Sequence, residues 1–395
     1  LYISYDGMLE PLGQSQVLAY LKRLANGRRI HLISFEKADD WANVAERVRL
    51  ARDIASAGIA WHPLRYHKAP SVLATAFDIM QGIIVGVWLC VRYKIKIIHA
   101  RSYIPSVIAL TLKKLFNVKY IFDMRGFWAD ERIDGGLWPK GGRIYRVAKW
   151  FEKRFLLSAD SVVSLTNAAV DEMKKFDYLQ GRLPNFKVIT TCTDLNLFDF
   201  KKTNINNSSK ESFVLGYVGS VGVWYLFDET LNCFKLILEK VPSAQLHIIN
   251  RGGHQYIRER LIDKRINPNK VMIETSDHAG VAKAMQSMDV GIFFIKPVYS
   301  KMSSAPTKLG EFLGCGIPCL SNTKVGDMAV ILNDEKVGVA LDSFDETSMK
   351  LGIEELMTLL NDPEIRERCR STALKYFSLD IGVRSYNHIY NRLIS

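Results

Sequence analysis

The chain has 395 residues, of which 48% are hydrophobic and 24% charged, and its formal net charge is +12. A single hydrophobic core rarely serves a chain of this length, so two domains are expected. The composition excludes a disordered or fibrous protein. The sequence shows no zinc-finger spacing and no aromatic RNA-binding motif, so no nucleic-acid partner is expected.

Apolar runs and helical patterns alternate through the first half of the chain. Strands are predicted at 1–5, 30–35, 95–100, 120–123, 161–165 and 187–190. Helices are predicted at 15–26, 41–57, 71–93, 104–116 and 144–157, where apolar residues recur at intervals of three and four. The longest apolar run, 83–91, is too short to cross a bilayer and predicts a buried helix. This alternation is typical of a parallel sheet covered by helices.

The same alternation returns in the second half. Strands are predicted at 213–217, 245–249, 271–274, 290–294, 318–321 and 339–341, and 348–395 is mostly helical with an interruption near 377–380. Between the halves lies the polar segment 201–211, KKTNINNSSKE, which is predicted to link two domains. The fold class is therefore α/β, with two doubly wound domains.

Ligands of such sheets bind beyond the carboxyl ends of the strands. After the first predicted strand, Gly13 opens a helix, and its missing side chain would let a phosphate or sugar approach the backbone. A plain strand-to-helix loop is the alternative interpretation of this glycine, and the spacing favours it.

Charged and aromatic residues crowd the ends of two further strands. Arg101 and Arg125 can bind anionic oxygens in a bidentate manner. Asp123 can orient one of these arginines or a substrate hydroxyl, and Trp128 can stack on a sugar ring. Structural ion pairs are the alternative interpretation of these charges.

The stretch 303–322, SSAPTKLGEFLGCGIPCLSN, indicates a loop, a short helix, a glycine turn and a strand. A helix starting beside Thr307 offers free N–H groups with Lys308 in its first turn, which suits a phosphate. Glu311 lies one turn further on the same face and can accept hydrogen bonds from a ribose diol. Gly219 and Arg251 follow other strands and should lie near Lys308. An ordinary strand-helix-strand unit is the alternative.

Other kinds of chemistry find little support in the sequence. No two aspartates are separated by a single residue and the histidines are dispersed, so no catalytic metal and no cofactor are expected. There is no G-x-S-x-G nucleophile elbow. The six scattered cysteines favour reduced thiols in a cytoplasm.

Five motifs together resemble the family 4 glycosyltransferases of the GT-B fold. They are PTKLGEFLGCGIP at 306–318, VGSVGVWY at 218–225, HARSYIPS at 99–106, FDMRGFWADER at 122–132 and SYDGMLEPLGQSQV at 4–17. The resemblance implies two Rossmann-like domains facing each other across a cleft. Residues 1–200 would bind the acceptor, 201–377 the nucleotide-sugar donor, and 378–395 would form a helix packing back on the first domain.

The resemblance also assigns roles to residues in the second domain. Glu311 matches the second glutamate of the family's Glu-x7-Glu motif, which holds the donor ribose, whereas Ser303 stands where the family usually has the first glutamate, which contacts the donor sugar. The family's arginine and lysine on the diphosphate fall near Ser220 and Leu226, which carry no charge. Their role would pass to Lys308, Arg251, Lys296 or Lys301, of which Lys308 and Arg251 are favoured. The neighbouring Ser304 and Thr307 complete the expected donor site. In many members a histidine of the first domain faces the sugar, and here Arg101, close behind His99, stands nearest to the place of that histidine.

The implied activity is metal-independent hexosyl transfer, with retention, from a nucleotide sugar to an acceptor hydroxyl. The catalytic residues would be Lys308, Arg101, Asp123 and Arg125. Such enzymes build bacterial surface polysaccharides or glycolipids on saccharide or lipid-linked acceptors. Since the chain is basic, peripheral binding to the anionic inner face of the membrane is an expected location. The alternatives are a nucleotide-sugar 2-epimerase of the same fold and a non-catalytic nucleotide-sugar-binding subunit.

Overall fold

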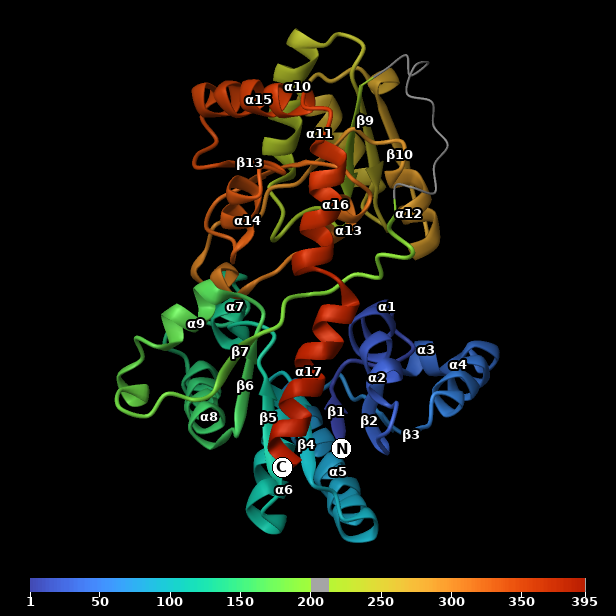
Figure 1. The fold of residues 1–395 in the computed structure, drawn as a ribbon, viewed down its shortest axis with the longest axis vertical. Helices are drawn as coiled ribbons and strands as arrows, with labels where there is room; N and C mark the ends of the chain where they lie inside the picture. Colours follow the sequence, from blue (N-terminus) through green and yellow to red (C-terminus); the bar gives the residue numbers. More distant parts are fainter. Residues whose placement is uncertain (200–212, 395) are drawn as a thin grey trace. The chain divides into compact units, whose positions relative to one another are not determined.

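The computed structural model describes residues 1–199 and 213–394, so the predicted linker 201–211 lies outside the described residues. The chain divides into two compact units, Leu1–Thr190 with Leu379–Ser395, and Thr191–Ser378. Each unit has its own sheet of parallel strands surrounded by helices (Figure 1). The predicted α/β class with two doubly wound domains is therefore confirmed.

The first unit contains a seven-stranded sheet in the order β3-β2-β1-β4-β5-β6-β7. Its strands are β1 (Tyr2–Ser4), β2 (Ile30–Glu36), β3 (Ile59–Arg65), β4 (Ile97–Arg101), β5 (Lys119–Asp123), β6 (Ser161–Ser164) and β7 (Phe186–Val188). The sequence did not predict β3, which contains Pro63. Proline cannot donate to a ladder, and β3 is accordingly an edge strand. The order of the strands reverses between β1 and β4, and ligands bind at such a switch point in open parallel sheets.

Helices connect the strands of the first unit. They are α1 (Pro11–Gly13), a π-helical turn (Gln14–Leu18), α2 (Ala19–Leu24), α3 (Ala38–Ala42), α4 (Val44–Ser56), α5 (Ser71–Tyr93), α6 (Tyr103–Phe116), α7 (Trp128–Asp134), α8 (Arg143–Ser158), α9 (Asn167–Met173) and a 3₁₀ turn (Asp177–Leu179). Among the described residues, α5 is long and apolar enough to cross a membrane by length and composition.

Helix α5 is not the buried helix that its apolar run predicts. Only 28% of its most apolar window is buried, and a stripe of large apolar side chains faces outward. Its inner face contains Gly82 and Gly86, where added Cβ atoms would lie 2.4 and 2.6 Å from side-chain atoms of Ile108 and Leu112. The glycines thus let α5 pack closely on α6, and the face of α5 that contains them is the buried one.

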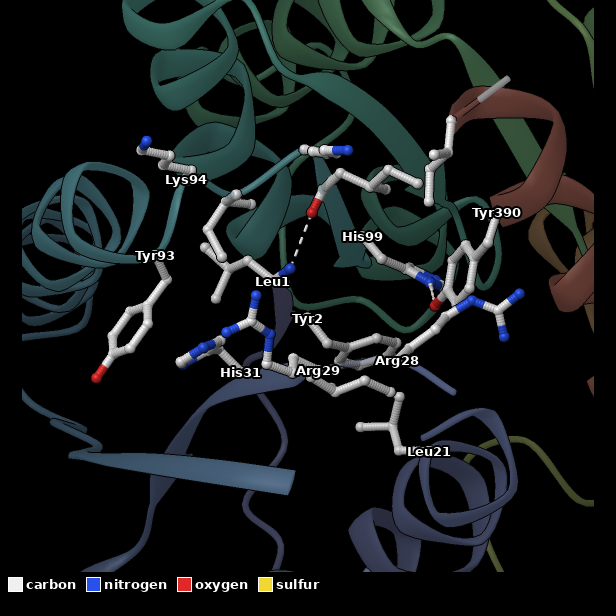
Figure 2. Close-up of a pocket in the computed structure, with 15 residues that line it drawn as sticks. Leu1, Tyr2, Leu21, Arg28, Arg29, His31, Tyr93, Lys94, His99 and Tyr390 are labelled. Carbon is white, nitrogen blue, oxygen red and sulfur yellow. Dashed lines mark hydrogen bonds between the residues drawn. The ribbon is translucent and has the colours of Figure 1, made fainter. Parts of the chain in front are cut away.

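The last helix, α17 (Leu379–Ile394), belongs to the first unit. Tyr390 bonds to Nδ1 of buried His99 on β4 at 2.7 Å, as Figure 2 shows. Tyr386 donates to Oδ2 of Asp123 on β5 at 2.9 Å. The cavity drawn in Figure 2, about 290 Å³, lies at the amino ends of β1 and β4, where Leu1 and Arg28 line it. It is therefore at the edge of the sheet opposite to the one where ligands are expected.

The second unit repeats the topology in a six-stranded sheet ordered β10-β9-β8-β11-β12-β13. Its strands are β8 (Val214–Val218), β9 (Gln245–Ile249), β10 (Val271–Glu274), β11 (Val290–Ile292), β12 (Cys319–Asn322) and β13 (Gly338–Leu341). Its helices are α10 (Phe227–Lys240), α11 (His254–Asp263), α12 (His278–Met285), α13 (Thr307–Gly314), α14 (Met328–Asp334), α15 (Glu346–Leu360) and α16 (Ile365–Tyr376), with 3₁₀ turns at Pro268–Lys270 and Tyr299–Ser303. In this sheet the order of the strands reverses between β8 and β11.

Candidate functional site

Helix α13 begins at Thr307, as the sequence predicts, and its first turn lies beside the end of β8. Pro306 precedes it in an extended conformation and makes no side-chain cap. The first N–H groups of a helix have no partner within the helix and sit at the positive end of its dipole. This end of α13 can therefore bind an anion.

Lys308, in that first turn, is only 8% exposed. Its Nζ lies 3.9 Å from the centre of the Tyr225 ring and 5.4 Å from that of Phe293. No hydrogen-bond acceptor contacts Nζ in the described part of the chain. A buried ammonium held only by aromatic faces is costly to maintain. A bound anion would supply the missing partner.

The loop after β8 approaches the same ammonium. Gly219 has a φ of +117°, and a Cβ atom on it would lie 2.8 Å from Nζ of Lys308. The carbonyl of Gly219 accepts from Nδ2 of Asn250 at 2.8 Å, and Oδ1 of Asn250 accepts from the N–H of Gly253. Asn250 thereby ties the loops after β8 and β9 together. The predicted proximity of Gly219 to Lys308 is confirmed.

Glu311 lies one turn along α13 and its side chain is 12% exposed. Its Oε1 is 3.5 Å from Nε2 of His278, at the start of α12. The hydrogen bond to Glu311, opposed by partial burial, raises the pKa of His278. The carboxylate is therefore available to a ligand while a weakly held imidazole neutralises part of its charge.

The variant His278→Gln is expected to lose more stability at pH 6 than at pH 9. The folded-state pKa of His278 is raised above its ordinary value of 6.5. Its pairing with Glu311 therefore stabilises the folded protein fully below pH 6.5, and this stabilisation is lost as the pH rises through the folded-state pKa. The imidazole is half exposed, so the effect stays below about 1 kcal/mol. Urea unfolding at both pH values measures it, with His388→Gln, on an exposed part of α17, as the control. Equal losses at the two pH values would contradict the pairing.

The other predicted donor-site residues lie around α13 with different exposures. Ser303 is 2% exposed and its hydroxyl donates to the carbonyl of Ser300 at 2.7 Å, within the turn before the helix. Ser304 and Thr307 are partly exposed. Ser220 and Arg251 are exposed after β8 and β9. Ser303 is thus part of the turn, while Arg251 is free to reach a ligand beyond the strand ends.

Sequence reasoning missed the aromatic residues that hold the cations. Trp224 stacks on Lys301, whose Nζ lies 3.8 Å from the ring centre, as Tyr225 stacks on Lys308. Both aromatic residues precede Leu226, where the family's cation is absent. The pair of aromatic side chains in VGSVGVWY was a visible signal, but nothing in the sequence indicated which lysines they would contact. His278 carried no sequence signal at all.

In the first unit, three predicted residues, Arg101, Asp123 and Arg125, gather with Asp6 at the carboxyl ends of β1, β4 and β5. Nε of Arg101 donates to Oδ2 of Asp6 at 3.1 Å, and Nη1 of Arg125 lies 3.9 Å from Oδ1 of Asp123. Burial alone would raise the pKa of Asp123, but the charge of Arg125 and the hydrogen bond with His99 lower it to about 2. Asp123 is therefore a buried anion that orients arginines.

The backbone at these strand ends is unusual. Ser102, after β4, and Arg125, after β5, have φ values of 72° and 59°. Such left-handed conformations cost free energy in residues other than glycine and gather at functional sites. They place Arg101 and Arg125 side by side in the lining of one cavity.

One expectation for the first unit needs correction. At Gly13 a Cβ atom would lie 2.0 Å from the carbonyl oxygen of Gly7, so the chain's own loop, and not a ligand, requires this glycine. The ring of Trp128 contacts the rings of Tyr103 and Trp138, with centroids 5.4 and 5.1 Å away, and the guanidinium of Arg132. Trp128 stays partly exposed and lines the same cavity as Arg101 and Arg125.

Within residues 1–199 and 213–394, no group of three or more His, Cys, Asp and Glu side chains is placed to hold a metal ion. The charged groups of the two clusters are the ammonium of Lys308 and the carboxylate of Glu311 in the second unit, and the guanidinium groups of Arg101 and Arg125 in the first.

Comparison with known proteins identifies the class that this fold and site define. The family described as glycosyl transferases group 1 matches residues 199–376, and the glycosyl transferase 4-like domain matches residues 16–182. The chain belongs to these glycosyltransferases, of family 4 type and GT-B fold. No curated protein matches the chain in sequence.

Solved structures show the same fold over the whole chain. A glycosyltransferase from Rickettsia africae is 14% identical with a TM-score of 0.74, covering 100% of this chain and 98% of its own. Sucrose-phosphate synthase from Thermosynechococcus elongatus is 13% identical with a TM-score of 0.71 and the same coverage. Anabaena HepE, solved with UDP-glucose, is 14% identical with a TM-score of 0.66, covering 99% and 98%.

Proposed function

We propose that the protein transfers a hexosyl group from a nucleoside-diphosphate sugar to an acceptor hydroxyl, with retention and without a metal ion. The observation that carries this proposal is the buried, unpartnered ammonium of Lys308 at the N-terminus of α13, beside Gly219. A leaving diphosphate is the anion that such a site suits in a glycosyltransferase.

In this mechanism the bond between the anomeric carbon and the diphosphate oxygen breaks first. Lys308 and the free N–H groups of α13 stabilise the negative charge that develops on that oxygen, and Arg251 adds charge at the rim. The acceptor hydroxyl attacks from the face that the diphosphate leaves, and its proton passes to the departing phosphate oxygen. The protein contributes positioning and electrostatics.

The nucleotide we propose first is uridine diphosphate. The structural neighbour HepE was solved with UDP and with UDP-glucose. Glu311, partly buried on α13 with Oε1 at 3.5 Å from His278, has acceptor sites for two hydrogen bonds from the ribose diol. Since the chain is basic, we place the enzyme on the cytoplasmic side of a bacterial membrane, in the assembly of a surface polysaccharide or glycolipid.

Replacing Glu311 with glutamine is expected to weaken binding of UDP by about 1–3 kcal/mol, because a charged acceptor of ribose hydroxyls becomes neutral. Calorimetry without metal measures the dissociation constant, and Glu335→Gln, on the surface in an ion pair with Lys375, is the matched control. If Glu311→Gln binds UDP as the parent protein does, Glu311 does not contact the ribose.

The overall reaction is tested by incubating the protein with a panel of nucleotide sugars, with and without cell-envelope acceptors. Release of nucleoside diphosphate that depends on the acceptor, with an α-linked product from an α-linked donor, is the expected result. Isomerisation of the donor without acceptor would instead identify an epimerase. Tight nucleotide binding without turnover of any donor would identify a binding subunit.

A further inference from the structure

One face of helix α5 presents large apolar side chains to solvent. We call the row that recurs at intervals of three and four residues the α5 stripe: Leu73, Phe77, Met80, Ile84, Trp88 and Val91. Each of these side chains is between 43% and 70% exposed. Their spacing keeps them on one side of the helix, opposite the glycines that pack on α6. At 1.5 Å per residue the stripe is about 27 Å long.

Helix α8 presents a second apolar patch to solvent. Ile144, Val147 and Trp150 recur every three residues and are all exposed. Helices α5 and α8 both pack against α6. Val72 of α5 and Val147 of α8 also line the same cavity. The α5 stripe and the α8 patch therefore belong to one side of the first unit.

The exposed charges of these two helices are cationic. The exposed cations are Arg143, Arg146, Lys153 and Arg154 on α8, and Arg92 and Lys94 at the end of α5 and just after it. The guanidinium of Arg154 lies 5.0 Å from the centre of the Trp150 ring. The structure describes both helices in full, and their acidic side chains, Asp78 and Glu152, are both fully buried. Apolar and cationic side chains thus share this surface without exposed acids.

This combination distinguishes among the partners that could cover the surface. A second copy of the chain would bring the same cations against these cations, and like charges oppose such a contact. A nucleic acid would bind the cations but leave the α5 stripe in water. An anionic bilayer satisfies both, because acyl chains surround apolar side chains while phosphates pair with arginine and lysine. Trp88 and Trp150 suit the boundary between the two regions.

We propose that α5 and α8 form a docking surface for an anionic lipid bilayer, with the α5 stripe and Trp150 at the headgroup boundary and the cations on lipid phosphates. Helix α5 lies along the bilayer surface and does not span it. Its buried Asp78 accepts a hydrogen bond from Tyr5 at 2.8 Å, and a span would carry this carboxylate into hydrocarbon. This inference names the contact surface for the membrane location proposed above and uses no donor-site residue.

Flotation of the full chain with lipid vesicles tests the docking surface. The probes are vesicles of phosphatidylcholine alone and vesicles with equal amounts of phosphatidylcholine and phosphatidylglycerol, both without nucleotide. We expect binding to the anionic vesicles to be more than about tenfold tighter. Trp88→Glu, which puts a carboxylate in the α5 stripe, should abolish flotation. Val330→Glu, on α14 of the second unit and similarly exposed (60% against 52%), should bind as the parent protein does.

A matched pair of double variants tests the cations. Arg143→Gln combined with Arg146→Gln should weaken binding to the anionic vesicles roughly twentyfold to thirtyfold, since each cation near such a surface contributes about a factor of five. Arg258→Gln combined with Lys283→Gln removes the same charge from exposed positions of the second unit and should have little effect. Thermal unfolding checks that every variant is folded.

Equal binding to the neutral and the anionic vesicles would overturn the proposal, as would flotation of Trp88→Glu at the level of the parent protein. Equal losses in the two double variants would also overturn it. A dimer that forms without lipid and that Trp88→Glu dissociates would assign the α5 stripe to a second copy of the chain instead. UDP binding is measured without vesicles: a chain that binds UDP but no vesicle keeps its proposed function and loses only this inference.

Discussion

Lys308→Met is expected to lower kcat/KM for the donor by about 10²–10³, the loss seen when one preorganised group that stabilises a developing oxyanion is removed. Methionine retains most of the side-chain volume against Tyr225 and Phe293. The substitution removes the charge that, in the proposed mechanism, stabilises the leaving diphosphate. Affinity for UDP should fall with it, and both quantities are measured on the purified chain.

The same substitution is not expected to lower stability. The ammonium's cation–π contacts contribute about 1 kcal/mol, and removing a desolvated cation without a hydrogen-bond acceptor offsets that loss. The free energies of unfolding in urea of Lys308→Met and Lys375→Met are compared. In the parent protein the ammonium of Lys375 stacks on Tyr376 at the surface. A variant that loses activity only because it unfolds would contradict this role for Lys308.

Asp123→Asn is expected to cost about 2–3 kcal/mol of unfolding free energy at pH 7. The carboxyl has a pKa of about 2 in the folded chain against 3.8 ordinarily, and this difference corresponds to that free energy. The charge orients Arg125 and accepts from Tyr386 of α17, so its loss also loosens the last helix.

The pH dependence has a definite sign. Because the folded-state pKa is depressed, the stabilisation is complete above about pH 4 and disappears as pH falls toward 2. The difference between the parent protein and Asp123→Asn should therefore shrink over that interval in urea unfolding. Asp171→Asn, an exposed aspartate paired with Lys174, is the control and should cost less than about 1 kcal/mol. If the difference in unfolding free energy between the parent protein and Asp123→Asn does not change between pH 4 and pH 2, the charge of Asp123 does not stabilise the folded protein.

The sequence predicted features that local chemistry dictates. The start of α13 at Thr307 follows from Pro306, and the turn after it from Gly316, whose φ is +72°. Both sheets follow from apolar runs alternating with helical periodicity. The edge strand β3 was not predicted because Pro63 interrupts its pattern, although proline is compatible with an edge.

The exposure of α5 could not be predicted from the sequence, for a different reason. A helix with an apolar run has the same sequence pattern whether its outer face contacts protein or solvent. Only the packing of Gly82 and Gly86 against α6 shows which face is covered. Likewise, the sequence predicted that Gly13 lets a phosphate or sugar approach the backbone. Its neighbour proved to be the carbonyl of Gly7 and not a ligand.

By itself, then, the sequence determined the glycosyltransferase family and the two doubly wound sheets. It also singled out Lys308 and Glu311 as the residues proposed to bind a nucleotide. These depend on motifs and on interactions between residues close along the chain. Only the tertiary structure decided that Lys308 is buried against Tyr225 without an acceptor, that His278 pairs with Glu311, and that Arg101 and Arg125 lie side by side in the lining of one cavity. Such contacts join elements far apart in sequence, and burial changes the energy of a charge in a way that no residue pattern records.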